Sequence, residues 1–331
     1  MISEKLKKTS AAAGFCAAVL ASGCVGAQAE WQPSEPVEIM VHSKPGSSPD
    51  VVARTIQKIW QDEGIVDVPV TVLNKATQAA GFTYLDQQEG NPHKLTVSST
   101  GTISAKILGT TTIGFRDLTP ISLLMSEYTA LGVPADSPFE TGADFLAKLK
   151  EDPSTISIGT GGARGNPNHT HVARAAKAAE IDPRELKMVV FSSGADARNA
   201  VIGGHIEAVT TSAGSMIGQK ESGLLRVIAV ASPERLSGAL SDVPTWKELG
   251  FDVVNSNWRW GGATGGLTDE QIAFWEDAFR KATQTDAWAE FVASQKADST
   301  YLDREETLKF FEGEEEGLTD LLTELDLVKS N

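Results

Sequence analysis

A strand that passes through a glycine and serine turn directly into a helix is the feature that most constrains the fold of this chain. Residues 39–60 read IMVHSKPGSSPDVVARTIQKIW, where an apolar run precedes the turn and apolar side chains recur at helical spacing from Val52 onward. Ser48 is a suitable N-terminal cap, and Pro49 suits the first helical position. The turn is therefore predicted to present free backbone N–H groups at the positive end of a helix, where they can hold a carboxylate or a phosphate.

The same unit of strand, turn and helix recurs along the chain. Residues 155–159 lead into the turn TGGARGNPN and a helix, with Asn166 as a possible cap and Pro167 at the first position. Residues 187–191 lead into SSGAD and a short helix. This alternation predicts an α/β fold with parallel, doubly wound sheets, whose ligands lie at the carboxyl ends of strands.

Helix signals also mark the C-terminal part of the chain. Thr268 and Gln271 have the spacing of a capping box, which predicts that a helix begins there. Residues 303–328 are predicted to form two acidic surface helices. About 300 residues exceed what one hydrophobic core usually serves, so we expect two domains.

The N-terminal segment predicts export. Basic residues precede an apolar stretch from Ala11 to Gly26, and Ala27-Gln28-Ala29 has the form of a signal peptidase site, so residues 1–29 are interpreted as a signal peptide. Cys24 also lies in a degenerate lipoprotein motif, which leaves lipidation open. Because Cys16 and Cys24 both lie in this segment, we expect the mature periplasmic protein to have no disulfide.

The charge of the chain excludes some classes of partner. The predicted signal contains three lysines and one glutamate, so its removal takes the formal charge from -15 to -17. Such an acidic surface argues against nucleic acid and anionic membranes as partners. It also repels small anions, but only beyond a Debye length of about 8 to 10 Å at moderate salt. An anionic ligand would therefore be held by local dipoles and one or two cations.

Four segments together resemble a known family. They resemble, in this order, the signature blocks of the extracytoplasmic solute receptors of tripartite tricarboxylate transporters: VHSKPGSSPDVVAR, GTGGARGNPNHTHVA, FSSGADARNAVIGGHIEAV and LLRVIAVASPERLSGALSDVPTWKELGFDV. The resemblance implies a type II periplasmic binding protein, with two doubly wound α/β domains that are joined by crossover strands and close like a Venus flytrap. It also implies that a small organic carboxylate is held mainly by the two glycine-rich turns and is delivered to membrane transporter subunits. We expect a monomer.

The resemblance assigns ligand-binding roles to residues of both turns. From the first turn it implies Ser43, Gly46, Ser47, Ser48 and Asp50, and from the second Thr160, Gly161, Gly162 and Asn168. The first turn departs from the family pattern, because Ser47-Ser48 replaces a Gly-Gly pair and His42 and Lys44 stand where small or apolar residues are common. These changes add side-chain donors that can alter the choice of ligand. Residues 74–81 depart from the usual Asn-Arg-Pro-Gly run, which leaves their contribution open.

Other candidates follow from side-chain chemistry. Arg164 is either a bidentate carboxylate clamp or a solvated loop residue, and Lys44 is either a ligand cation or a solvated turn residue. His169 and His171 point in different directions at a helix start, so His169 is predicted to donate to a ligand and no metal or cofactor is expected. Thr100 ends a strand where a pocket wall would lie, and Ser193 is placed in the third turn of the same kind. The run Trp258-Arg259-Trp260 either covers the ligand or packs at a domain junction.

The sequence gives weaker support to other functions. A nucleotide enzyme is disfavoured, because Gly159, Gly161 and Gly165 do not have the dinucleotide-binding spacing. A hydrolase that uses Ser47 or Ser193 lacks the G-x-S-x-G elbow. A ligand-sensing subunit for a membrane kinase shares the fold and differs only in its partner, so it stays an alternative.

The predicted domain division follows the expected crossovers. Domain 1 comprises residues 31–128 plus 232–331, and domain 2 comprises residues 129–231. The crossovers are expected near 124–133 and 227–232.

Overall fold

One sheet runs through the residues that the computed structural model describes, which are 31–161 and 164–328. Its strands follow the order β2-β1-β3-β9-β4-β7-β5-β6, and β8 pairs with β4 beside this path. The strands are β1 (Val37–Val41), β2 (Val70–Asn74), β3 (Lys94–Ser99), β4 (Thr119–Pro134), β5 (Ile158–Gly161), β6 (Met188–Phe191), β7 (Ala208–Ser212), β8 (Leu225–Val230) and β9 (Ser256–Ala263). The predicted signal peptide, including Cys24, and Gly162 of the second turn lie outside the described residues.

The two ends of the sheet are parallel and its centre is antiparallel. β1 pairs in parallel with β2 and β3, and β5 with β6 and β7. β4 pairs antiparallel with β9 through its first part, up to Tyr128, and with β7 and β8 from Thr129 onward. The prediction of parallel sheets is therefore correct for the two ends and incomplete for the centre. β4 belongs to both ends, so it is a crossover strand.

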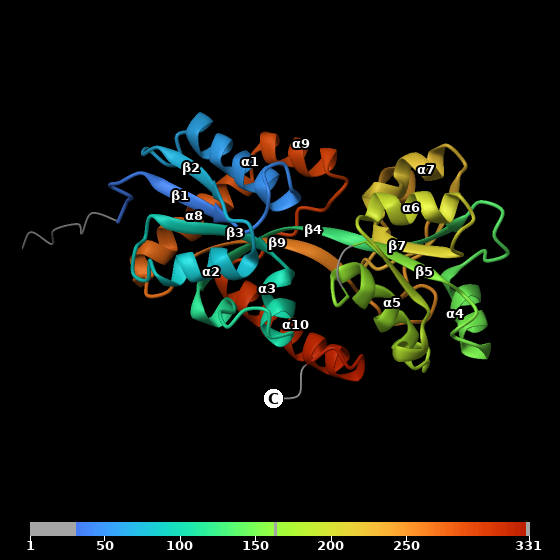
Figure 1. The fold of residues 1–331 in the computed structure, drawn as a ribbon. Coiled ribbons are helices and arrows are strands. Elements are labelled where there is room, and N and C mark those ends of the chain that lie inside the picture. Colours follow the sequence, from blue (N-terminus) through green and yellow to red (C-terminus); the bar gives the residue numbers. More distant parts are fainter. Residues whose placement is uncertain (1–30, 162–163, 329–331) are drawn as a thin grey trace, which may run out of the picture. The chain divides into compact units, whose positions relative to one another are not determined.

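Helices cover both faces at each end of the sheet, as a doubly wound α/β fold requires (Figure 1). Near β1, the helices α1, α8 and α9 lie on one face and α2, α3 and α10 on the other; near β5, α6 and α7 lie opposite α4 and α5. The helices are α1 (Ser48–Asp62), α2 (Gln78–Asp86), α3 (Gly101–Ile107), α4 (Gly142–Glu151), α5 (Pro167–Ala178), α6 (Gly194–Ile202), α7 (Ile217–Glu221), α8 (Asp269–Thr283), α9 (Asp286–Ser294) and α10 (Arg304–Glu324), with short 3-10 helices η1 (Phe115–Asp117), η2 (Pro183–Glu185), η3 (Ala213–Met216) and η4 (Gly238–Leu240). In the part of the chain that the structure describes, none of these helices combines the length and apolar character that a membrane span requires.

The buried apolar side chains form separate cores at the two ends of the sheet. Around α1, the Trp60 ring is fully buried with Trp275 and Phe279, and its Nε1 donates to the carbonyl of Ala278 at 2.9 Å. Fully burying a side chain such as Phe contributes about 1.5 to 3 kcal/mol. This core fixes α1, and thereby the turn that precedes it.

The second core contains residues that the sequence assigned to domain 1. Trp246 and Val253 pack with Leu131 and Phe145 at the β5 end of the sheet. The chain then returns along β9, whose first residue, Ser256, pairs with Tyr128 of β4. The predicted domain division stays a prediction, but this packing favours a second boundary near residue 255 over one near 231.

Local helix signals in the sequence were mostly accurate. The capping box at Thr268 is present, and Asn166 caps α5 by accepting a hydrogen bond from the N–H of His169 at 3.0 Å. The N-cap of α1 is Ser47 rather than Ser48, because Ser48 already has helical geometry. The predicted pair of acidic C-terminal helices is wrong: α10 is one continuous helix of 21 residues. Its buried stripe from Phe311 to Leu322 continues past Gly313 and Gly317, so packing outweighs their low helix propensity.

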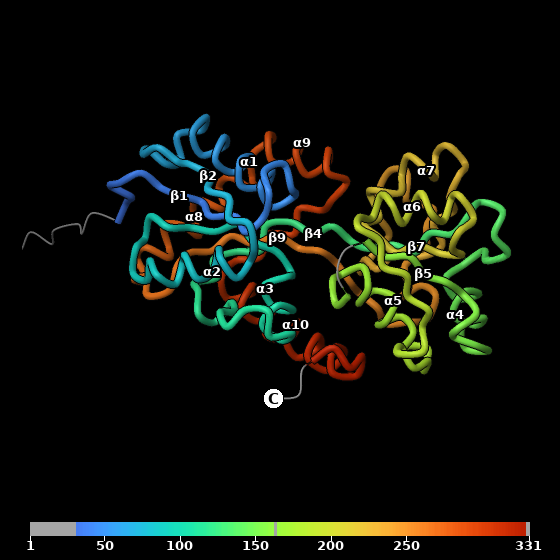
Figure 2. Tube along the Cα trace, viewed as in Figure 1, coloured from blue at the N-terminus to red at the C-terminus, as the bar shows by residue number. Residues whose placement is uncertain are grey.

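Figure 2 traces the chain from β1 to α10 and shows how the sheet crossover carries it between the two ends. The turns after β1 and β5 both follow the carboxyl end of a strand and precede a helix, as predicted. These turns are called the first turn (residues 42–47) and the second turn (residues 161–166) below.

Candidate ligand-binding site

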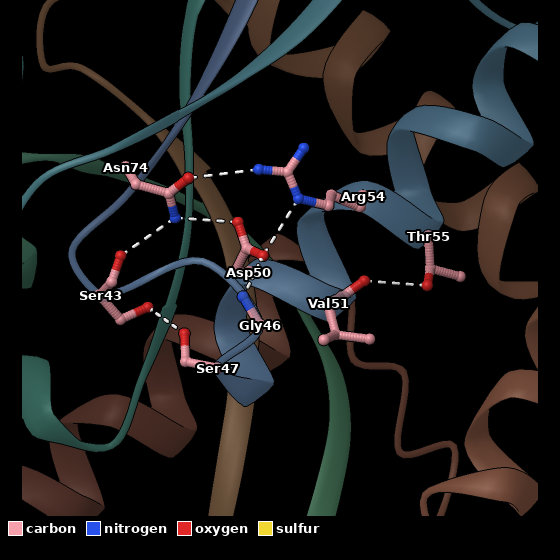
Figure 3. Close-up of polar contacts among 8 residues, drawn as sticks. All are labelled: Ser43, Gly46, Ser47, Asp50, Val51, Arg54, Thr55 and Asn74. Carbon is pink, nitrogen blue, oxygen red and sulfur yellow. Dashed lines mark hydrogen bonds and ion pairs between the residues drawn. The ribbon is translucent and has the colours of Figure 1, made fainter.

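One buried carboxylate holds the first turn from within. Asp50, in the N-terminal helical turn of α1, is 1% exposed. It accepts hydrogen bonds from the N–H of Gly46 at 2.8 Å and from Arg54 Nε at 3.0 Å (Figure 3). Its other oxygen accepts from Asn74 Nδ2 at 2.8 Å, and the same amide donates to the carbonyl of Ser43 at 3.0 Å. The turn is thereby tied to the end of β2 and to the helix that follows it.

These donors keep the Asp50 carboxylate ionised. Burial alone would raise the pKa of Asp50, but hydrogen bonds from Arg54, Gly46 and Asn74 outweigh it and hold the pKa below its ordinary value. A hydrogen bond to a charged group contributes about 1.5 to 3 kcal/mol. The negative charge lies at the positive end of α1, so this helix end is already partly neutralised by its own side chain.

The exposed side of the first turn consists of hydroxyl groups and a lysine. The hydroxyls of Ser43 and Ser47 lie 2.5 Å apart, and Lys44 is exposed. Gly46 has a φ of 80°, which favours glycine, and the N–H of Ser47 donates to the carbonyl of Lys44 at 3.2 Å. The prediction of free backbone N–H groups is therefore wrong for Gly46 and Ser47, because both groups already have acceptors in the protein. Side-chain hydroxyls are the donors that this turn offers.

His42 is a neutral member of the same turn. Its Nε2 lies 2.7 Å from Ser98 Oγ, which in turn lies 2.8 Å from Thr102 Oγ1. Burial lowers the pKa of His42 to about 4, and the nearby charge of Arg259 acts in the same direction. The imidazole is therefore uncharged at neutral pH and interacts by hydrogen bonding rather than by charge. Thr100 is buried, and its Oγ1 accepts from the N–H of Trp258 at 3.1 Å.

Arg259 lies near the first turn, in the run for which the sequence left two roles open. It extends from β9, is 3% exposed, and pairs with Glu127 at 2.8 Å. Its Nη2 and Nε also donate to Ser48 Oγ at 2.8 and 3.2 Å, so the predicted ligand-binding residue Ser48 is bound to the crossover strands. Burial lowers the pKa of Arg259, and Glu127 opposes that effect. Its neighbours Trp258 and Trp260 are fully buried against Phe311, which selects the packing interpretation of this run.

The second turn is held by neutral groups. Asn166 donates to the carbonyl of Gly161 at 2.6 Å, and the Nδ1 of His169 accepts from the N–H of Gly165 at 2.8 Å. His169 is 3% exposed, and burial together with the charge of Arg164 lowers its pKa to about 4. Because its Nδ1 is an acceptor here, only its Nε2 is left as the predicted donor to a ligand.

Two further predicted residues lie in β5 and at the start of α5. Thr160 is fully buried, and its hydroxyl has no hydrogen-bond partner among the described residues. Asn168 is half-buried, and its carbonyl accepts from Thr210 Oγ1 at 3.0 Å. Gly161 contacts α6 instead: a Cβ added there would lie 2.1 Å from the backbone N of Gly194. The end of β5 is therefore in direct contact with the N-terminus of α6.

Ser193 caps α6 and is exposed. Its hydroxyl donates to the carboxylate of Asp196 at 2.8 Å and accepts from the N–H of the same residue at 3.2 Å. Arg198, one turn further along α6, donates from Nη1 to Ser215 Oγ at 2.9 Å. Sequence reasoning did not identify Arg198, because a single arginine in a short helix carries no pattern.

Arg164 lies in the second turn, close enough to His169 for its charge to lower the pKa of that residue. It is exposed at a hollow of about 230 Å³ whose wall includes His169, Arg184 and the residues 325–327 after α10. Among the described residues Arg164 has no carboxylate partner within 4 Å, and its role as a clamp stays a prediction.

The structure thus gathers the predicted residues in two groups. His42, Ser43, Ser47, Ser48 and Asp50 surround the first turn, and Thr160, Gly161, Asn168 and His169 surround the second. Strand β4 connects the groups, because Glu127 binds Arg259 beside the first turn and Thr129 pairs with Ser212 at the other end of the sheet.

Comparison with known proteins gives consistent matches. The model of the tripartite tricarboxylate transporter family receptor (TctC) matches residues 69–327. The Cupriavidus necator UPF0065 protein in gbd 5'region is 25% identical over 307 residues, which cover 91% of each chain. BugT of Bordetella pertussis is 25% identical over 302 residues, which cover 86% of this chain and 88% of BugT.

Solved structures agree with these sequence matches. A TctC solute binding protein from Polaromonas has a TM-score of 0.79 and 26% identity, over 88% of this chain and 99% of that protein. MatC from Rhodopseudomonas palustris with bound malate has a TM-score of 0.66 and 19% identity, over 88% of this chain and 99% of MatC. R. palustris Rpa4515 with adipate has a TM-score of 0.69 and 17% identity, over 89% of this chain and 98% of that protein.

Proposed function

Because this chain belongs to the tripartite tricarboxylate transporter receptor family, we propose that it is a periplasmic solute-binding protein that captures a small organic carboxylate and delivers it to membrane transporter subunits. The observation that carries this proposal is the pair of strand–turn–helix units at opposite ends of one sheet, which β4 connects. The malate and adipate bound by two proteins of the same fold support a carboxylate as the ligand.

In this proposal the two turns hold the ligand from both sides. The hydroxyls of Ser43 and Ser47 and the neutral imidazole of His42 donate to it from the first turn, with Lys44 at the rim. From the second turn and its neighbours, the start of α5 offers Asn168 and His169. One helix N-terminus carries about half a unit of positive charge, so a single turn would hold a carboxylate weakly. Two turns that close together hold it well, and closure therefore accompanies binding.

Residues that were expected to touch the ligand take supporting roles in this proposal. Asp50 and Ser48 are already bound by Arg54, Asn74 and Arg259, so they fix the shape of the first turn. Thr100 likewise supports β9 through its bond to Trp258. Gly161 allows the end of β5 to approach α6.

Binding without catalysis follows from the partners of the candidate nucleophiles. Within residues 31–161 and 164–328, the hydroxyl of Ser47 is bonded to Ser43 and that of Ser193 to Asp196, and neither is bonded to a histidine. A serine nucleophile needs an adjacent base, so a hydrolase is the weaker reading. A sensor subunit for a membrane kinase remains the alternative that shares the whole site.

Export completes the proposal. We propose that residues 1–29 are removed and that the mature protein begins at Glu30. The intact mass of protein recovered from the periplasm tests this, and a mass that includes a diacylglyceryl group on Cys24 would replace it with a lipoprotein anchor.

A thermal-shift screen of organic acids tests the function itself. A ligand at 100 times its dissociation constant stabilises the protein by about 2.7 kcal/mol, which gives a clear rise in the unfolding temperature. The best ligand is then used in small-angle scattering, where the radius of gyration should fall on binding. A screen in which no carboxylate shifts the transition would contradict the proposal.

A further inference from the structure

Arg198 is a half-buried cation for which the described residues supply no carboxylate within 4 Å. Its Nη1 donates to Ser215, but its Nε is buried and has no acceptor in the described part of the chain. Burial lowers the pKa of its guanidinium, with no opposing anion. Arg259, by comparison, is more deeply buried but is paired with Glu127 at 2.8 Å. A charge taken out of water without a counter-ion is unfavourable, so Arg198 is poised for an anion.

The guanidinium lies beside a second positive group. A side chain in a helix runs back toward the helix N-terminus, and the Nη1 of Arg198 lies 3.6 Å from the place that a Cβ on Gly194 would occupy. Gly194 is the first residue of α6, and Thr211 Oγ1 lies 2.8 Å from the same place. The positive end of α6 and the arginine are therefore adjacent, and the exposed Asp196 in the N-terminal helical turn of α6 offsets only part of their positive potential.

The helix that carries Arg198, α6, and the helix that follows the first turn, α1, lie on the same side of the sheet. Figure 1 shows α1 and α6 above the same face. Two residues of β4 are connected to the two sites. Glu127 pairs with Arg259, which binds Ser48 beside the first turn. Thr129 pairs with Ser212, which precedes the short helix that contains Ser215. These two positions are two residues apart on the strand, which is about 7 Å. The segments that hold the first turn and the Arg198 anchor are therefore attached to β4 at positions separated by about the length of a small dicarboxylate.

We propose that Arg198 binds a second acidic group of the ligand, so that this receptor selects small dicarboxylates over monocarboxylates of equal length. The inference rests on the proposed function, in which the first turn holds one carboxylate. When the ligand displaces the groups that cover Nε, the edge of the guanidinium formed by Nε and Nη2 binds a carboxylate bidentately, while Nη1 stays anchored on Ser215. Ser215 and Thr211 lie 3.4 Å apart through their hydroxyls and fix this anchor.

Calorimetric titration with matched ligands tests the inference. The probes are succinate, glutarate and adipate, each beside its monoamide, which has the same shape and one charge fewer. The parent protein should bind the best diacid about tenfold to a hundredfold more tightly than its monoamide. Arg198→Met should remove most of this difference by weakening diacid binding, and should leave monoamide binding within about threefold.

A matched control separates this role from a general effect of losing an arginine. Arg304, the first residue of α10, also has a buried Nε without an acceptor in the described residues. Arg304→Met should leave both affinities unchanged. If Arg198→Met does not fold, Arg198→Lys keeps the charge without the bidentate fork and should still reduce the discrimination by about threefold to tenfold.

The outcomes distinguish the inference from the function on which it rests. Equal loss of diacid and monoamide binding in the Arg198 variants, or no loss of either, overturns the role of Arg198 and leaves the carboxylate receptor standing. A parent protein that binds monoamides as tightly as diacids does the same. Failure of the parent to bind any of these carboxylates or any acid in the thermal-shift screen overturns both.

Discussion

The first and second turns use the same backbone device with different chemistry. Gly46 and Gly165 have φ values of 80° and 82°, and each donates its N–H to a side chain four residues later in the helix that follows. The acceptor is the ionised carboxylate of Asp50 in the first turn and the neutral imidazole of His169 in the second. The N–H of the glycine therefore needs a hydrogen-bond acceptor on the side chain four residues later, whether or not that side chain is charged.

Because the two acceptors differ in charge, the N-termini of α1 and α5 differ in electrostatic potential. The Asp50 carboxylate at the start of α1 partly cancels the positive potential of that helix end. The N-terminal helical turn of α5 contains no acidic residue. We therefore expect an anionic ligand to be attracted more strongly to the second turn, and to be oriented by hydroxyl donors at the first. Variants of both turns and unfolding at different pH values test this comparison.

The largest effect is expected where the second turn meets α6. A Cβ on Gly161 would lie 2.1 Å from the backbone N of Gly194, and backbone cannot move aside as a side chain can. Gly161→Val should therefore cost about 3 kcal/mol or more of unfolding free energy, measured by urea denaturation. Gly218→Ala in α7 is the control, because nothing lies within 4 Å of its Cβ position, and it should be neutral or slightly stabilising. Equal stability of the Gly161 variant and the parent would show that this contact is not a constraint.

This contact also shows what the sequence could and could not predict. The strand–turn–helix units and the caps at Asn166 and Thr268 were predictable, because their signals lie within a few residues of one another. The contact between Gly161 and Gly194 joins two such units, so no local pattern reports it. The same holds for Arg259, which reaches Ser48 across 211 positions.

The residues of the first turn were predicted better than the contacts that they make. Asp50 and Gly46 were both assigned to the first turn, and an acidic residue in the first helical turn behind a glycine is a signal from which their hydrogen bond could have been anticipated. The sequence did not show that this bond uses the N–H that a ligand was expected to take. Asn74 contributes to the same network from β2, in a segment whose departure from the family pattern concealed it.

Removal of the Asp50 carboxylate should have the next largest effect. Asp50→Ala leaves the N–H of Gly46 without its acceptor and removes one acceptor each from the side chains of Arg54 and Asn74, so we expect a loss of about 2 to 3 kcal/mol in thermal or chemical unfolding. Asp62→Ala removes an exposed carboxylate from the same helix, where it pairs with Lys58, and should cost no more than about 0.5 kcal/mol. If the two variants are equally stable, the first turn is not held by Asp50.

The two turns should weaken in different pH ranges. His169 has a pKa of about 4 in the folded protein and about 6.5 when unfolded, so the unfolded chain binds more protons between these values. The stability that the neutral imidazole gives to the second turn is therefore present above pH 6.5 and is lost as the pH falls toward 4, by roughly 1.4 kcal/mol per pH unit. The pKa of Asp50 is lowered, so its contribution is present above its unfolded pKa and is lost only at more acidic pH, as the pH falls through the folded value.

Unfolding curves across this pH range test the assignment. The fully buried His171, whose pKa burial lowers to about 3, and His42 add the same sign of dependence, so the comparison needs a variant rather than the parent alone. His169→Gln keeps an acceptor for the N–H of Gly165 without a titrating group, and its stability should fall less steeply between pH 6.5 and 4. An unchanged slope would show that His169 does not titrate as its burial requires.

The smallest effect is expected from substitution of Gly46 and Gly165, the two glycines of positive φ that donate to a side chain four residues later. Gly46→Ala places a Cβ where nothing lies within 4 Å, so its cost comes from the positive φ alone, about 1 kcal/mol. Gly165→Ala has the same strain and also brings its Cβ to 3.2 Å from Leu322 and 3.3 Å from Leu108, so it should cost somewhat more. Gly46→Asn should recover part of the loss, because asparagine tolerates this conformation. The three variants are ranked by urea denaturation at neutral pH, where Asp50 is charged and His169 is neutral. A Gly46→Ala cost well above that of Gly165→Ala would mean that the acceptor charge, and not only the shared backbone geometry, decides how rigidly each turn is held.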